Sequence, residues 1–123
     1  STGRSPVTIG LASDIGGGTR YSMLETMAEA YKVAQMNQAP ISVWQAFATA
    51  TVGNAALAGL SDEVGRVEPG HWADVVVLDP RATPVLAARD ALSEDLESRL
   101  FALMMLGDDR AVQATYVAGV RRK

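Results

Sequence analysis

The stretch VTIGLASDIGGGTRYS, residues 7–22, decides which fold we expect from this chain. Its first part, residues 7–12, is almost entirely apolar, which is typical of a parallel strand buried on both faces. One acid, Asp14, follows this run, and a cluster of glycines comes soon after it. The stretch therefore predicts a buried strand that ends at a carboxylate and a glycine loop.

Helix-start signals follow the loop and recur further along the chain. Ser22 with Glu25, and Ser42 with Gln45, have the spacing of a capping box, in which two side chains satisfy free backbone N–H groups at a helix start. The segments behind these pairs carry apolar residues at helical spacing. We expect two helices here, the second of them weakened near Gly53.

The sequence pattern changes near residue 65, from helix signals to turn and strand signals. A turn signal precedes the β-branched run 75–78, and residues 111–123 predict two short strands about a tight Ala118-Gly119 turn. Residues 95–106 have the pattern of a helix. The expected order is β, α, α, β, α, β, β, with the later strands paired in a small sheet that is separate from the first strand.

Composition excludes several classes of protein. The 123 residues are 48% hydrophobic with a formal net charge of −3, so we expect one soluble globular domain, or a piece of a larger one, without a nucleic-acid partner. We expect no membrane partner, because no apolar run is long enough to span a bilayer. The absence of cysteine excludes disulfides and thiolate metal sites. The chain starts at Ser1 without a signal-peptide pattern, so we expect it to come from within a longer protein.

Asp14 and the glycines behind it have three chemical interpretations. A glycine loop can bind phosphate through its backbone N–H groups, but this loop matches neither phosphate-binding pattern and Asp14 would repel the anion. The glycines can instead form a tight turn beside an exposed acid. A carboxylate at the C-terminal end of a buried strand is also where α/β barrels place catalytic groups. The residues alone leave the second and third interpretations level.

Other polar residues have simple structural interpretations. We expect Asp108, Asp109 and Arg110 to cap a turn and to pair locally, because aspartate favours turns and exposed ion pairs are common. The only histidine, His71, lies beside Trp72, and we expect it to be a structural residue rather than a metal ligand.

Three segments of the chain resemble the amidohydrolase superfamily. Residues 10–33, GLASDIGGGTRYSMLETMAEAYKV, look like the last barrel strand, loop and helix of its guanine deaminase family. Residues 64–80, VGRVEPGHWADVVVLDP, are similar to the segment by which the superfamily returns from the barrel to a small β-sandwich. Residues 100–123, which include LGDDR, are similar to the C-terminus of guanine deaminases.

This resemblance implies an α/β fold that is only part of an enzyme. Residues 1–64 would be the C-terminal end of a (β/α)8 TIM barrel, with its last strand and helices, and residues 65–123 part of the flanking small β-sandwich with a helix. A complete barrel needs roughly 250 residues, so most of it is missing from this chain. The implied activity is the zinc-dependent hydrolysis of guanine to xanthine and ammonia in purine catabolism, in the cytoplasm.

The resemblance also implies the site residues and partners. Asp14 matches the family's aspartate that binds zinc and accepts a proton from the attacking water, and Gly16, Gly17 and Gly18 would keep the pocket beside it open. The residues that bind the purine are not identified. We expect guanine and Zn²⁺ to bind the complete enzyme, the isolated chain to bind no zinc and be inactive, and the chain to form a homo-oligomer, most simply a dimer.

Two alternatives to a guanine deaminase remain. The chain can belong to another amidohydrolase that acts on a ring amine or halide, such as a chlorohydrolase or an adenosine-type deaminase, because these share the segment of residues 64–80. It can also be a non-catalytic interaction module, since strands cut from a barrel leave unpaired edges that favour association.

Overall fold

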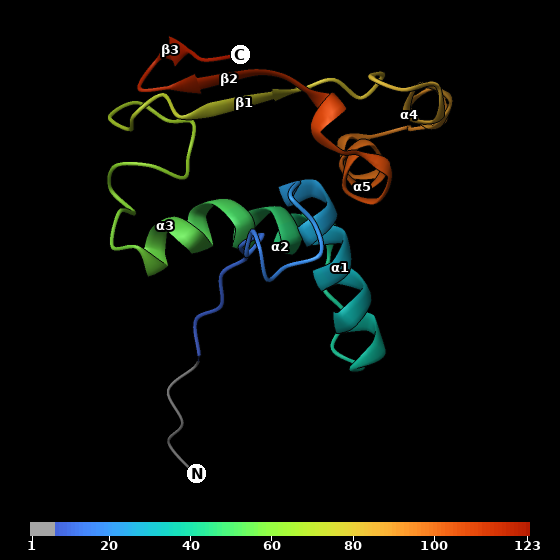
Figure 1. The fold of residues 1–123 in the computed structure, drawn as a ribbon, viewed down its shortest axis with the longest axis horizontal. Coiled ribbons are helices and arrows are strands. Elements are labelled where there is room, and N and C mark those ends of the chain that lie inside the picture. Colours follow the sequence, from blue (N-terminus) through green and yellow to red (C-terminus); the bar gives the residue numbers. More distant parts are fainter. Residues whose placement is uncertain (1–6) are drawn as a thin grey trace.

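The computed structural model describes residues 7–123 of the chain. Its helices are α1 (Met23–Met36), α2 (Val43–Ala48), α3 (Asn54–Leu57), α4 (Pro84–Asp90) and α5 (Leu96–Leu106), with a π-helical turn η1 (Thr49–Gly53) and a 3₁₀ turn η2 (Asp109–Ala111). Its strands are β1 (Val75–Leu78), β2 (Val112–Val117) and β3 (Val120–Arg121). Figure 1 shows the sheet above α2 and α3, with α4 and α5 beyond the end of β1 and β2.

The sheet is small and entirely antiparallel. Strand β2 lies between β1 and β3, with Val75 opposite Tyr116 and Val117 opposite Val120. The turn between β2 and β3 has positive φ at both Ala118 (51°) and Gly119 (77°), the backbone shape that joins two-residue hairpins with the right twist. The expected pairing of the late strands in a small sheet, and the turn between them, are confirmed.

One hydrophobic core joins the helices from both halves of the chain. Tyr31 of α1 packs edge-on against Phe101 of α5, with ring centroids 5.4 Å apart. Met104 of α5 is fully buried in the centre of the core. The other buried members of this cluster are Leu24, Met27, Ala28, Val43, Ala46, Leu86, Leu103 and Ala111.

The expected helices form, but one expected cap does not. Ser42 and Gln45 make a complete capping box at the start of α2, as predicted. Helix α1 begins directly after Ser22, yet the Ser22 side chain makes no capping hydrogen bond. The capping box expected between Ser22 and Glu25 is therefore wrong, because the Glu25 carboxylate lies 3.4 Å from Arg20 Nη1 instead.

The first expected strand is also absent from the described residues. Residues 7–12 form no strand, and Val7 and Ile9 are 84% and 68% exposed rather than buried on both faces. A strand needs neighbouring backbones for its N–H and C=O groups, and the described sheet, of β1, β2 and β3, does not pair with residues 7–12. The observed order among residues 7–123 accordingly begins with helices rather than with a strand.

Helix α4 was not expected from the sequence. Thr83 caps it by accepting a hydrogen bond from Leu86 N at 3.2 Å, and Pro84 occupies its first turn. At its end, the buried carboxylate of Asp90 accepts hydrogen bonds from Arg99 Nε at 2.6 Å and Arg81 Nε at 3.1 Å. These bonds join α4 to α5 and to the turn after β1.

Candidate functional site

Asp14 lies at the start of a tight turn and is exposed. Its φ angle is +49°, in the left-handed region that residues other than glycine seldom adopt. The N–H of Gly17 donates a hydrogen bond to the Asp14 carbonyl O at 2.9 Å, and the N–H of Gly18 donates to the same oxygen. Aspartate adopts this region in turns more readily than most residues, so the φ angle is that of a tight turn, as it is at Ala118 in the hairpin.

The glycines behind Asp14 leave the space that its carboxylate occupies. A Cβ atom on Gly17 would lie 2.7 Å from Asp14 Oδ2, and one on Gly18 would overlap the Ser13 carbonyl O. Gly16 has a φ angle of +97° with open space around it. Any larger residue at position 17 would therefore move the carboxylate, which explains why glycine follows the acid here.

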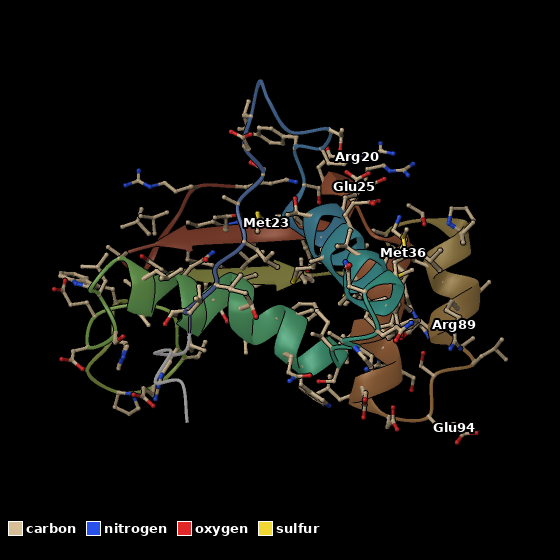
Figure 2. The ribbon with its side chains drawn as sticks, turned by 90° about the horizontal axis from the view of Figure 1, so that it is seen from below. Arg20, Met23, Glu25, Met36, Arg89 and Glu94 are labelled. Atoms are coloured by element: carbon tan, nitrogen blue, oxygen red, sulfur yellow. The ribbon has the colours of Figure 1, made fainter. Side chains whose placement is uncertain are left out.

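Arg20 and Glu25 close the far end of this loop. Figure 2 shows their side chains next to each other at the start of α1. A shallow hollow of about 180 Å³ lies against the loop, lined by Ile15, Gly16, Gly18, Thr19, Arg20 and Tyr21. Asp14 is not part of this lining, so the hollow alone does not form a binding site around the carboxylate.

Two residues that the sequence analysis passed over fix the segment before Asp14. Asn54, at the start of α3, accepts a hydrogen bond from Leu11 N at 3.0 Å and donates one to the Leu11 carbonyl O at 2.7 Å. Gly10 permits this approach, because a Cβ there would overlap Asn54 Oδ1 and would also lie 2.6 Å from Leu57 Cδ1. The available signal was Asn54 itself, because asparagine directly after glycine is unfavourable inside a helix.

The described residues do not form a zinc site by themselves. Catalytic zinc needs about three protein ligands plus a water. Within residues 7–123, no group of three or more histidine, cysteine, aspartate or glutamate side chains lies close enough together to hold a metal ion. Asp14 is therefore not part of such a group among these residues, and a zinc ion at this place would need further ligands from outside this part of the chain.

His71 has the structural role that was expected. Its Nε2 lies 3.0 Å from the Ser61 carbonyl O, and its Nδ1 lies 3.4 Å from a carboxylate oxygen of Glu68. The next residue, Trp72, donates its backbone N–H to the Glu63 carbonyl O at 2.8 Å. These contacts fold the loop between α3 and β1 on itself.

The charged residues near the end of α5 form a local pair, as predicted. Asp108 accepts a hydrogen bond from the Arg110 backbone N–H at 2.9 Å and pairs with its guanidinium at 2.7 Å. The hydrogen bonds from Arg110 hold the pKa of Asp108 below its ordinary value. This arrangement starts the η2 turn and lies outside the glycine loop.

A wide groove separates the helical layer from the sheet. Its volume is about 680 Å³, and apolar side chains of α2, α3 and β1 dominate its walls. The lining residues include Phe47, Ala55, Leu60, Val75 and Leu78.

Comparison with known proteins shows which family the chain matches. The profile of the Amidohydrolase family matches residues 4–122. The guanine deaminase of Escherichia coli strain K12 is 46% identical over 113 residues, which cover 92% of this chain and 26% of the relative. The guanine deaminase of Homo sapiens is 32% identical over 122 residues, which cover 92% of this chain and 27% of the relative.

Solved structures show the same similarity. The E. coli guanine deaminase has a TM-score of 0.91 and 44% identity, and the match covers 95% of this chain and 27% of that chain. The guanine deaminase from Bradyrhizobium japonicum has a TM-score of 0.85 and 31% identity, covering 95% and 31%. An adenosine deaminase from Xanthomonas campestris, solved with bound zinc, shares the fold alone, with a TM-score of 0.65 and 21% identity over 81% of this chain and 22% of that chain.

Two further observations concern the length of the chain and the character of its helices. It spans about a quarter of the length of the curated relatives that it matches. Among residues 7–123, none of the helices has both the length and the apolar character needed to cross a membrane.

Proposed function

Because this chain belongs to the amidohydrolase family, we propose that it is the C-terminal part of a guanine deaminase, which hydrolyses guanine to xanthine and ammonia. The observation that carries the proposal is the match of 95% of the chain to the E. coli guanine deaminase at a TM-score of 0.91 and 44% identity. The identity to the Xanthomonas adenosine deaminase is 21%, which supports guanine rather than adenosine as the substrate.

In this proposal, Asp14 is the carboxylate that the chain contributes to the active site. Its place directly before the glycine loop, its exposure and the space left by Gly17 support a functional role. A carboxylate in this position can accept a proton from the attacking water during hydrolysis. We expect no such reaction in residues 7–123 alone, because the groups that bind guanine are not among the site residues found here.

Zn²⁺ is the proposed cofactor of the complete enzyme, with Asp14 as one ligand. The bound zinc in the related Xanthomonas structure supports this choice of metal. Since the described residues contain no cluster of metal ligands, the other ligands would come from the rest of the enzyme. The complete enzyme here means this chain together with the remaining part of the fold found in its relatives.

The division of the chain follows from the same proposal. Residues 1–64 would complete the barrel, with residues 7–12 paired to a neighbouring strand that this chain lacks, and residues 65–123 would form part of the flanking β-sandwich. Residues 1–6 lie outside the described structure. The exposed side chains of Val7 and Ile9 support a missing neighbour, because apolar residues in a barrel strand are normally covered.

Exposed apolar side chains also support association with another copy of the enzyme. Trp44 and Trp72 are 46% and 57% exposed, and the outer edge of β1 is free among residues 7–123. Large aromatic side chains are enriched at protein interfaces. The rest of the enzyme would cover part of this surface, and we propose that a second copy covers the remainder in a homodimer.

A chimera tests the proposed function. Residues 7–123 would replace the matching part of the E. coli guanine deaminase, and xanthine release from guanine would be measured by absorbance. We expect the chimera to convert guanine, and the isolated chain neither to convert it nor to bind zinc with the affinity of a catalytic site. A chimera that is folded and zinc-loaded but leaves guanine unchanged would contradict the proposal.

A further inference from the structure

The segment that carries Asp14 is attached to the helical layer at one well-defined point. Asn54 Oδ1 accepts from Leu11 N at 3.0 Å, and Asn54 Nδ2 donates to Leu11 O at 2.7 Å. Asn54 Nδ2 also donates to the Ala50 carbonyl O at 3.2 Å. Because the backbone offers one donor and one acceptor, only one orientation of the carboxamide satisfies both, so the side chain pairs with Leu11 as a neighbouring strand would.

The helix is shaped to allow this close approach. A Cβ atom on Gly10 would overlap Oδ1 of Asn54, whereas one on Gly53 would make only an ordinary contact with the Ile9 carbonyl O, at 3.7 Å. The π-helical turn η1 ends at Gly53, directly before Asn54. Such turns are rare and occur frequently at functional sites. Gly10 and the end of an irregular turn thus lie on either side of the Asn54 contact.

The position of this contact connects it to the carboxylate. Leu11 precedes Asp14 by three residues, and residues 7–12 pair with no strand within the described chain. On the other side of Asp14 along the chain, the loop is exposed at Ile15, Gly16 and Gly17. The Asn54 contact is therefore the last side-chain hydrogen bond from another element before the turn that holds Asp14.

We infer that Asn54 is a positioning residue, whose carboxamide holds the Leu11 backbone so that the Asp14 carboxylate stays in its reactive position. This inference rests on the proposed function of Asp14. It assigns Asn54 no contact with the substrate. Displacement of a reacting group by about 1 Å can lower a rate about 100-fold, so a side chain that fixes this segment can have a large effect from outside the reaction centre.

The test compares Asn54→Ala and Asn54→Asp with a matched control in the complete enzyme. Asn54→Ala removes both hydrogen bonds to Leu11, whereas Asn54→Asp keeps an acceptor for the Leu11 N–H and loses the donor. Asn37→Ala is the control, because Asn37 is exposed and its side chain donates only to Val33 O in its own helix, at 2.9 Å. The readouts are hydrogen exchange at the Leu11 amide and the separate values of kcat and KM for the zinc-loaded, folded fraction.

We expect Asn54→Ala to expose the Leu11 amide to exchange and to lower kcat about 10- to 100-fold, with KM within about threefold of the parent. Asn54→Asp should retain part of the Leu11 protection, and Asn37→Ala should match the parent in every readout. Unchanged Leu11 exchange in Asn54→Ala, or lost protection with a normal kcat, would overturn the inference. Failure of both Asn54 variants to fold would also overturn it, because Asn54 would then be needed for folding as a whole.

The result of the Asn54 test can be told apart from the result of the test of the proposed function. If Asp14→Asn keeps full activity, the role of Asp14 is wrong, whatever happens at Asn54. The Leu11 exchange measurement does not depend on turnover, so it reports on the Asn54 contact in either case.

Discussion

Gly10 and Asn54 lie so close together that a Cβ atom at position 10 would overlap Oδ1 of the Asn54 side chain. Gly10→Ala should therefore displace the carboxamide from Leu11 and have the same effect as removing it. We expect faster exchange of the Leu11 amide and a fall in kcat similar to that of Asn54→Ala. Asn37→Ala, the exposed control used for Asn54, should change neither quantity.

The double variant distinguishes a shared mechanism from two separate ones. Substitutions that act through one contact are not additive, whereas independent ones add within about 0.3–0.5 kcal/mol. Gly10→Ala combined with Asn54→Ala should lose less activity than the sum of the two single losses, with the remaining effect of Gly10→Ala coming from its contact with Leu57 Cδ1. A fully additive loss in kcat/KM would show that Gly10 acts by another route.

The buried carboxylate of Asp90 should make stability depend on pH. Burial opposes its ionisation, but the hydrogen bonds and charges of Arg99 and Arg81 outweigh this and hold the pKa of Asp90 below its ordinary value. A lowered folded-state pKa contributes stability above the unfolded pKa of about 3.9, and that contribution is lost as the pH falls through the folded value. Asp90→Asn should therefore lower Tm by several degrees at pH 7.

The difference in Tm between Asp90→Asn and the parent should begin to narrow below about pH 4, because the unfolded parent then binds a proton that the folded state binds only at a lower pH. Thermal unfolding followed by circular dichroism between pH 7 and pH 3 measures this difference in Tm. Asp62→Asn is the matched control, since Asp62 is an exposed loop acid. A difference in Tm that stays constant from pH 7 to pH 3 would contradict the assigned charge interaction.

The core that joins the two halves of the chain should depend on Met104. Its side chain is fully buried in α5, whereas Met36 at the end of α1 is 83% exposed (Figure 2). Met104→Ala should reduce the free energy of unfolding by about 2–5 kcal/mol through lost burial and the cavity left behind. Met36→Ala should change it by less than about 0.5 kcal/mol. Denaturant unfolding gives both values, and equal values would show that the core is not where the structure places it.

Local sequence patterns predicted those elements whose partners are within this chain. The helix of residues 95–106, the capping box at Ser42 and the hairpin turn at Ala118 form because short-range spacing and turn chemistry specify them. Helix α4 escaped prediction because it is one short segment fixed by distant contacts, above all those of Asp90 with two arginines. The Ser22 capping box failed because Arg20, outside the motif, binds Glu25.

The first strand was predicted from a pattern that describes burial in a larger structure. Residues 7–12 are apolar, but the backbone that would pair with them is not part of residues 7–123. The sequence singled out Asp14 and its glycines, and the structure adds the positive φ and the close approach of Gly17. The part played by Asn54 needed coordinates, because its partner is backbone 43 residues away.

The central claim, that this chain supplies the catalytic carboxylate of a guanine deaminase, is tested most directly by Asp14→Asn in the complete enzyme. The substitution keeps the shape of the side chain and removes its negative charge, and xanthine release from guanine would be measured at saturating zinc. Loss of a positioned acid–base group slows a reaction by about 10²–10⁴-fold, so we predict a fall of that size with little change in Tm. Turnover within about threefold of the parent would contradict the claim and leave Asp14 as a turn residue only.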